Sequence, residues 1–424
     1  MGRRPRDIER TVMELIMSDD SARKKQLAKK IFDVAYKEGI FPSSIHGFYM
    51  ARGRGEFSGF TVPAINLRSM TYDLARKIFR VAKKNNSGAF IFEIAKSETG
   101  YTNQPPIEYS SVVLAAAIKE SYSGPIFIQG DHFQANAAKF RENPDKEIEG
   151  LQALIADAIS SGFYNIDIDS STLVDLSKPD LKQQQLLNYE VCTKLTQFIR
   201  RIEPRGITVS VGGEIGEIGH QNSTPEDLHA FMVGLKERLH KKLVGISKIS
   251  VQTGTTHGGV VLPDGSIAQV KLDFNTLKTL SEIARKEYGL AGAVQHGAST
   301  LPSEAFHKFA ECETAEVHLA TDFQNMIYES KHFPADLKKR IYDWLKVNTA
   351  NDAKQGETEE QFLYKTRKKA LGPFKKEIMS LPQETRDAIA AEIENKFDLL
   401  FKQLHVVDKR DYVDKYVTLK RLWK

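Results

Sequence analysis

The stretch GPIFIQGDHFQAN, residues 124–136, joins a short apolar run to an aspartate and a histidine. A short apolar run between turn residues is typical of a strand that is buried on both faces. Asp131 and His132 follow at the point where such a strand ends. The stretch therefore predicts a buried strand, and its end is either a polar turn or the start of a catalytic site.

The same pattern occurs eight times between residues 60 and 322, with amphipathic stretches between the runs. Such alternation is typical of a parallel sheet with crossover helices, and eight units fit a (β/α)8 barrel of about 250 residues. A doubly wound open sheet is the alternative, but no glycine fingerprint follows its would-be first strand. We therefore expect an α/β protein built on a (β/α)8 TIM barrel. The expected strands are FTVPAINL (60–67), GAFIFEIAK (88–96), GPIFIQG (124–130), FYNIDID (163–169), ITVSVGGE (207–214), GISKISVQTG (245–254), GLAGAVQHG (289–297) and AEVHLATD (315–322).

The segments on both sides of the barrel are predicted to be helical. Apolar residues recur at three- and four-residue spacing before residue 40 and again after residue 330. The glycine- and arginine-rich segment 51–60 follows no strand, which favours a flexible connection over a phosphate-binding loop. The expected domains are an N-terminal helical segment and loop (1–59), the barrel (60–330) and a helical C-terminal extension (331–424) that packs on the barrel or on a partner subunit.

Composition excludes several classes of protein. The chain has 424 residues, of which 41% are hydrophobic and 27% charged, with a net charge of +5. No lysine- and arginine-rich block is interleaved with aromatic residues and no apolar run could span a bilayer, so neither nucleic acid nor a membrane is an expected partner. The basic start MGRRPRDIER lacks the apolar core of a secretory signal. The only cysteines are Cys192 and Cys312, which rules out a disulfide framework. We expect a cytoplasmic protein.

Polar residues gather at the ends of the expected strands. In a (β/α)8 barrel the C-terminal ends of all strands meet at one face, which carries the active site. His132, His257 and His296 follow the third, sixth and seventh strands. A single histidine is more often structural, but three imidazoles with one open position are how catalytic zinc is commonly held. The carboxylates Asp131, Asp169 and Glu214 would surround them, and Thr321 and Asp322 follow the last strand.

Several short motifs resemble the class II, metal-dependent fructose-bisphosphate/tagatose-bisphosphate aldolases. They are VPAINL, GDH, DIDSS, GGEIGEIG, GTTHGG followed by KLDF, HGAS and LATDFQ, in the family's order over residues 60–330. The resemblance implies a lyase that reversibly cleaves a ketose (bis)phosphate, most simply fructose 1,6-bisphosphate. The products would be dihydroxyacetone phosphate and glyceraldehyde 3-phosphate, formed through a metal-stabilised enediolate.

The resemblance also assigns roles to residues. It implies that His132, His257 and His296 bind Zn²⁺ or another divalent cation, and that Asp131 is the catalytic acid/base. Glu214 and Asp169 match acidic positions of a second or alternative metal site, so a second metal or a monovalent cation is also allowed. The implied substrate-binding residues are Asn66, Gly258, Gly297, Ser299, Thr321 and Asp322.

Some positions depart from the family pattern. His318 stands where the family usually has an asparagine that contacts the enediolate; its ring either takes over that contact or points into the helix layer. No lysine follows the HG of the sixth strand, and HGAST replaces the usual HGGSG. The carbanion-forming base would be Glu217 or Glu226. However, STPEDL also predicts a helix start with Thr224 as cap and Pro225 first in the helix, which is the favoured interpretation of Glu226.

Two other functions remain open. The GDHFQAN motif also resembles the non-catalytic partner subunit of tagatose-bisphosphate aldolase, although such a subunit has little need for three converging histidines. A Schiff-base aldolase would use Lys96 or Lys248 as nucleophile, which leaves the histidines unexplained. The expected partners are a small-molecule sugar phosphate and further copies of the chain, in a dimer or larger homo-oligomer.

Overall fold

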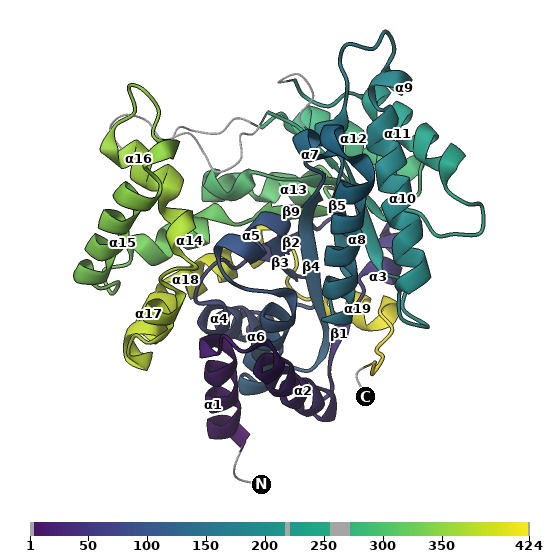
Figure 1. The fold of residues 1–424 in the computed structure, drawn as a ribbon. Coiled ribbons are helices and arrows are strands. Elements are labelled where there is room, and N and C mark those ends of the chain that lie inside the picture. The colour runs from purple at the N-terminus through teal and green to yellow at the C-terminus, as the bar shows by residue number, and fades with distance from the viewer. Residues whose placement is uncertain (1–3, 217–220, 255–271, 423–424) are drawn as a thin grey trace.

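A computed structural model of the chain describes residues 4–216, 221–254 and 272–422. Eight parallel strands form a closed barrel, since β2 pairs with both β3 and β9 and β4 pairs with β5 (Figure 1). Each strand coincides with one of the eight expected runs, although β4 and β6 continue beyond theirs, to Gln134 and Gly216. This confirms the (β/α)8 barrel and excludes the open sheet. The strands are β2 (Val62–Asn66), β3 (Ile91–Ala95), β4 (Gly124–Gln134), β5 (Asn165–Asp169), β6 (Ser210–Gly216), β7 (Lys248–Val251), β8 (Ala293–Gln295) and β9 (Glu316–Leu319).

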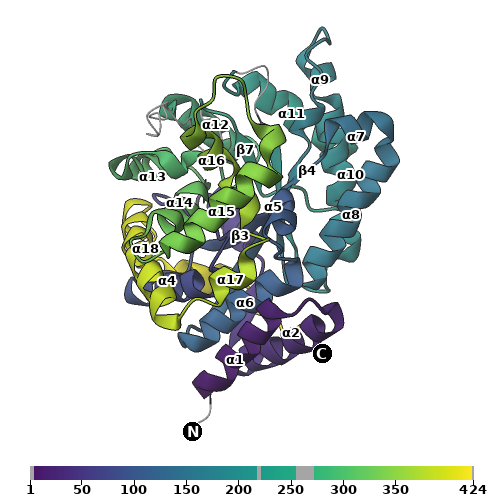
Figure 2. The same ribbon diagram turned by 60° about the vertical axis from the view of Figure 1, so that its left-hand side comes forward.

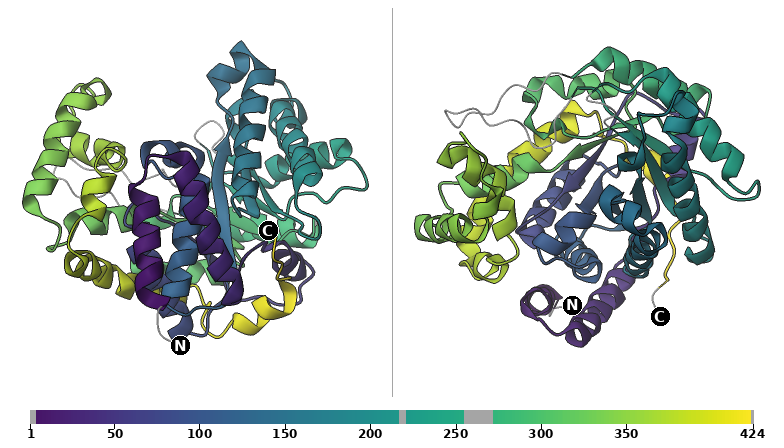
Figure 3. Two further views of the ribbon diagram at one scale, coloured as in Figure 1. Left: turned by 60° about the horizontal axis from the view of Figure 1, so that its bottom comes forward. Right: turned by 45° about the horizontal axis from the view of Figure 1, so that its top comes forward.

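Helices cover the outside of the barrel, as the view from the top in Figure 3 (right) shows. Their apolar faces lie on the strands and their polar faces are turned to solvent, the pattern that amphipathic spacing dictates. No described helix is both long and apolar enough to cross a membrane. The principal helices between successive barrel strands are α4 (Thr71–Lys84), α6 (Pro106–Lys119), α8 (Pro144–Ser160), α10 (Leu186–Ile202), α11 (Pro225–Arg238), α12 (Phe274–Lys286) and α13 (His307–Glu311).

The C-terminal segment returns to the barrel. Its longest helix, α18 (Gln383–Gln403), packs against α4, where Lys77 Nζ lies 2.9 Å from Glu394 Oε2. Before α18, the chain forms a helical lobe that lies at the left of the barrel in Figure 1 and in front of it in Figure 2. The lobe consists of α14 (Thr321–Glu329), α15 (Ala335–Asn348), α16 (Glu359–Thr366) and α17 (Lys375–Met379). The last strand, β9, ends at Leu319. The helix that covers the barrel next to α4, α18, follows only after the lobe, from residue 383.

The N-terminal segment covers two regions of the barrel. Helices α1 (Arg4–Met17) and α2 (Ser21–Lys37) pack on α6. A strand that the sequence did not predict, β1 (Ile40–Ser43), pairs with the start of β4, before β4 reaches β5. The last helix, α19 (Arg410–Tyr416), lies on α3 (His46–Gly53) (Figure 1).

The expectation of a flexible connection at residues 51–60 is wrong for its first part, which belongs to α3. Arg52 is fully buried there, and its guanidinium donates to the carbonyl oxygens of Ala291 (3.1 Å) and Thr314 (3.3 Å), as well as to that of Phe60. Buried carbonyl groups need donors, and the five N–H groups of one arginine supply several at once. Arg52 therefore has a structural role: it satisfies buried carbonyl groups of three segments of the chain.

The barrel interior is charged below the level of the strand ends. Lys248 Nζ lies 2.9 Å from Asp167 Oδ2, 2.5 Å from Glu316 Oε1 and 2.8 Å from Gln129 Oε1. Gly212 makes room for the first of these pairs, because a Cβ atom at this position would lie 2.3 Å from Asp167 Oδ1. This layer supports the side chains at the upper ends of the strands.

Candidate active site

A bulge in β4 turns two consecutive side chains into the barrel. Consecutive residues of a regular strand point to opposite faces. The register between β4 and β5 shifts between Gly130 and Phe133. Within this bulge His132 has a φ of 42°, in the left-handed region that residues other than glycine rarely adopt. Such strain costs about 1–3 kcal/mol and persists where the surrounding structure imposes it. Both Asp131 and His132 consequently face the barrel axis.

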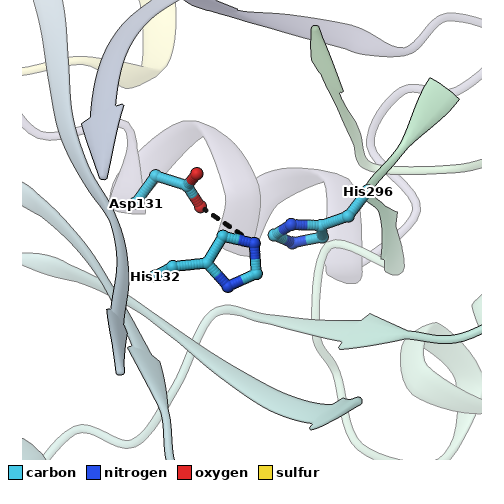
Figure 4. A group of neighbouring side chains, drawn as sticks. All are labelled: Asp131, His132 and His296. Atoms are coloured by element: carbon cyan, nitrogen blue, oxygen red, sulfur yellow. Dashed lines mark ion pairs between the residues drawn. The ribbon is translucent and has the colours of Figure 1, made fainter. Parts of the chain in front are cut away.

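The bulge brings His132 to His296, which follows β8. The ring centroids are 4.2 Å apart at 61°, and His132 Nε2 lies 3.9 Å from Asp131 Oδ1 (Figure 4). One ligand atom from each of Asp131, His132 and His296 falls within 4.8 Å of the others. Two imidazoles and one carboxylate in such proximity fit a divalent cation of the zinc type.

Two further carboxylates orient His132 from its other side. His132 Nδ1 lies 3.3 Å from both Asp169 Oδ2 and Glu214 Oε2, and this group of three could itself hold a cation. A carboxylate that accepts from one ring nitrogen fixes the tautomer and directs the other nitrogen toward a metal. Asp169 and Glu214, which the resemblance assigns to a second or alternative metal site, thus both contact His132.

The pKa values of the acidic groups in the site are strongly shifted by burial and by neighbouring charges. Burial raises the pKa of Asp131, but His132, His318 and Lys248 outweigh it and hold that pKa well below its usual range. Burial and the neighbouring Asp169 raise the pKa of Glu214 to about 7, although His132 opposes the shift. Asp131 is therefore ionised at neutral pH, as a proton acceptor must be.

The predicted substrate residues lie at the ends of β2, β8 and β9. Ser299 Oγ accepts a hydrogen bond of 2.8 Å from the backbone of Ala320, beside Thr321 at the start of α14. Gly297 takes a φ of 69°, which lets the chain turn directly after His296. Asp322 forms an ion pair of 2.9 Å with Lys396. These residues form the loops after the seventh and eighth barrel strands, where TIM barrels often bind phosphate.

Asn66 is held by a residue that the sequence did not reveal. Its side-chain amide donates to Glu98 Oε2 at 2.5 Å, and Arg68 Nε donates to Glu98 Oε1 at 2.7 Å. Arg68 Nη1 also reaches Thr321 Oγ1 at 3.5 Å. Glu98 lies in α5 (Lys96–Tyr101) and is buried. It therefore fixes both an amide and a guanidinium beside the loops of β8 and β9.

Other predicted residues fall in different places. His257, Gly258 and Glu217 lie outside the described residues. Glu226 is exposed in the first turn of α11. Thr224 caps that helix, as predicted, by accepting from the backbone of Asp227 at 3.1 Å, and Pro225 begins it. The local role of this segment is therefore to start a helix.

His318 lies inside the barrel, not in the helix layer. Its ring stacks on His296 with centroids 4.1 Å apart. Nε2 lies 2.6 Å from Glu316 Oε1, while Nδ1 lies 3.0 Å from Glu93 Oε2 and 3.2 Å from Asp131 Oδ1. Burial lowers the pKa of His318, but Glu93 and Asp131 outweigh it and raise that pKa well above its usual value. Both nitrogens thus face carboxylates.

The two lysines of the Schiff-base alternative are engaged in ion pairs. A Schiff-base lysine must lose its proton to act as a nucleophile. Burial lowers the pKa of Lys248, but Asp167 and Glu316 outweigh it and raise that pKa above its usual value. Lys96 Nζ contacts Gln134 O at 2.7 Å and Glu147 Oε1 at 3.3 Å. The surroundings of Lys248 therefore do not favour a neutral amine.

Comparisons with known proteins give the family. The sequence profile of "Fructose-bisphosphate aldolase class-II" matches residues 54–403. No curated protein matches the chain in sequence.

Solved structures share the fold at low identity. They include a fructose-bisphosphate aldolase from Campylobacter jejuni (17% identity, 85% of this chain and 93% of that chain, TM-score 0.50). A probable tagatose 6 phosphate kinase from Sinorhizobium meliloti 1021 is similar as well (14% identity, 83% of this chain and 99% of that chain, TM-score 0.53). So is the fructuronate-tagaturonate epimerase of Cohnella laeviribosi (12% identity, 86% of this chain and 83% of that chain, TM-score 0.51). Because the family profile spans most of the sequence and the barrel is closed, the chain belongs to the class II fructose-bisphosphate aldolase family.

Proposed function

We propose that the chain is a zinc-dependent aldolase that reversibly cleaves a ketose bisphosphate, with fructose 1,6-bisphosphate as the first candidate. The products are dihydroxyacetone phosphate and glyceraldehyde 3-phosphate. The observation that carries the proposal is the bulge of β4, which sets Asp131 beside His132 and opposite His296. A proton acceptor next to two metal-type ligands suits a metal-dependent aldol cleavage.

His132 and His296 would hold the metal, with His257 as the third ligand that the sequence predicts. Their fit rests on the donor set, two imidazoles within reach of one carboxylate, and on the contacts of Asp169 and Glu214 that orient His132. A divalent cation bound there supplies a Lewis acid for the negative charge that cleavage leaves on the two oxygens of the enediolate.

Asp131 acts on the proton. In the cleavage direction its carboxylate accepts the hydrogen of the C4 hydroxyl as the C3–C4 bond breaks, and in the synthetic direction it returns that proton. Positioned groups of this kind typically contribute 10²–10⁴-fold to a rate. The low pKa of Asp131 keeps the carboxylate ionised before the substrate binds.

The neighbouring groups position the substrate. Ser299, Thr321 and the first turn of α14 offer hydroxyl and backbone N–H groups to a phosphate at the ends of β8 and β9. Arg68, fixed by Glu98 and in reach of Thr321, adds a positive charge to the same place. Asn66 lies beside them at the end of β2, with its amide nitrogen held by Glu98.

The chain should be purified alone and assayed for triose phosphate release from fructose 1,6-bisphosphate and tagatose 1,6-bisphosphate. We expect cleavage of at least one of them, and loss of cleavage in His132→Ala. His307→Ala is the matched control, because that histidine is 39% exposed and pairs only with Glu311 among the described residues. A non-catalytic partner subunit would cleave neither sugar when it is assayed alone. Absence of cleavage of both sugars would therefore refute the proposal.

A further inference from the structure

A second group of potential ligands lies deeper in the barrel than the pair of histidines. Glu93, Asp131 and His318 come from β3, β4 and β9, and they are 0%, 5% and 5% exposed. One ligand atom from each falls within 4.8 Å of the others. The group contains neither Asp169 nor Glu214, the carboxylates that the sequence assigned to an additional metal.

The contacts of His318 fix which nitrogen is available. Glu316 accepts from Lys248 at 2.5 Å and lies 2.6 Å from His318 Nε2. A carboxylate that is paired with a lysine is an acceptor, so Nε2 carries the hydrogen and donates it to Glu316. In the neutral ring, the form in which histidine binds a metal, the lone pair of Nδ1 is then directed at Glu93 and Asp131. A histidine held by a carboxylate on one nitrogen is a common arrangement for a metal ligand.

The atoms around Nδ1 are close together but not hydrogen-bonded. Among the described residues, His318 Nδ1, Glu93 Oε1 and Asp131 Oδ1 are buried and have no hydrogen-bond partner. Buried polar atoms without a partner are costly and call for a ligand, an ion or a water. A cation placed between Nδ1 and the two carboxylates, in place of a ring proton, would take up all three atoms.

The spacing suits a metal ion. Nδ1 lies 3.0 Å from Glu93 Oε2 and 3.2 Å from Asp131 Oδ1. Ligands at about 2.0–2.1 Å from a tetrahedral ion are about 3.3 Å from one another. The charge also fits, because Glu93, Asp131, Asp167 and Glu316 surround the ring and Lys248 supplies only one fixed positive charge in this layer.

We propose that Glu93, Asp131 and His318 form an inner cation site that binds a divalent transition-metal ion such as Mn²⁺ or Zn²⁺. Asp131 also belongs to the group with His132 and His296, so its carboxylate lies between the two sites. Paired metal ions in proteins are about 3.5–4 Å apart and often share such a ligand. The inner site does not rest on the proposed function, because it would exist whichever sugar is cleaved.

The test is metal stoichiometry. The full-length protein is stripped with chelator, loaded with Mn²⁺ by equilibrium dialysis and analysed by mass spectrometry. We expect two ions per chain in the wild type and one in each of Glu93→Gln and His318→Asn. Glu108→Gln is the matched control: it changes a buried carboxyl on α6 that pairs with Lys24 and Lys375, and it should keep two ions. Glu214→Gln probes the neighbouring group.

Two results would overturn the proposal. One is a wild type that binds a single ion per chain. The other is a second ion that survives in both Glu93→Gln and His318→Asn but is lost in Glu214→Gln, which would place it at Asp169 and Glu214. Two variants are used so that poor folding of one, seen by circular dichroism, leaves the other to decide. None of these readouts requires an active enzyme.

Discussion

Replacement of Lys248 by methionine tests whether this lysine is a structural cation or a catalytic nucleophile. The side chain is 1% exposed, and its ammonium group contacts Asp167, Glu316 and Gln129. Methionine retains much of the apolar volume but leaves two carboxylates facing each other without a cation. Breaking a buried ion pair by removing one partner costs about 3–5 kcal/mol, so we expect a loss of this size in the free energy of unfolding.

The loss should depend on pH. Burial raises the pKa of Asp167 to about 6 even though Lys248 lowers it, and without Lys248 that pKa rises further. A carboxyl group whose pKa is higher in the folded state than in the unfolded state favours folding below its unfolded pKa, and this contribution is lost as the pH rises through the folded pKa. The deficit of Lys248→Met should therefore be smaller at pH 5 than at pH 8.

Chemical denaturation of the chelated protein at both pH values measures the effect, because bound metal would add its own stabilisation. Lys96→Met is the control, since the Lys96–Glu147 pair is partly exposed and such pairs contribute about 0–1 kcal/mol. A Lys248→Met protein as stable as Lys96→Met would refute the structural role. So would borohydride trapping of substrate on Lys248 in the wild type.

Two further predictions concern the substrate. Asp131→Asn should lower kcat/KM by about 10²–10⁴-fold while the ion at His132 and His296 is retained. Steady-state kinetics with metal analysis measures both effects, and an unchanged kcat/KM would show that Asp131 takes no part in the proton transfer. Arg68→Met should raise KM for a phosphorylated sugar by about 10–100-fold with a smaller change in kcat, because hydrogen bonds to charged groups contribute about 1.5–3 kcal/mol. Arg80→Met, in an exposed ion pair, is the control, and an equal rise in KM for both variants would contradict a phosphate contact of Arg68.

The barrel could be predicted from sequence because its eight apolar runs are regular in spacing and each is followed by an amphipathic stretch. The additional strand β1 could not: it has four residues, includes Pro42, and is a strand only because the start of β4 extends beyond β5. The position of α18 was also hidden, since an amphipathic pattern shows that a helix is buried on one face but not against which partner.

The site could be predicted only in part, because its geometry depends on register. The positions of His132, His296 and Asp131 at strand ends follow from the topology, whereas the bulge that turns Asp131 and His132 to the same side is a tertiary feature. Glu93 and Glu316 lie within apolar strands, so a charge in the middle of a buried run was the available signal. Only pairing across the barrel shows that such charges meet.

The most direct test of the account is hydrogen exchange on dihydroxyacetone phosphate. The purified chain, loaded with Zn²⁺, is incubated with dihydroxyacetone phosphate in deuterium oxide without an aldehyde, and deuterium at C3 is followed by NMR. A metal-dependent aldolase should exchange one hydrogen stereospecifically, and chelation should abolish this exchange and added Zn²⁺ restore it, since formation of the enediolate needs the metal. Exchange that continues undiminished after chelation, or its absence in the fully loaded protein, would contradict a metal-dependent aldolase.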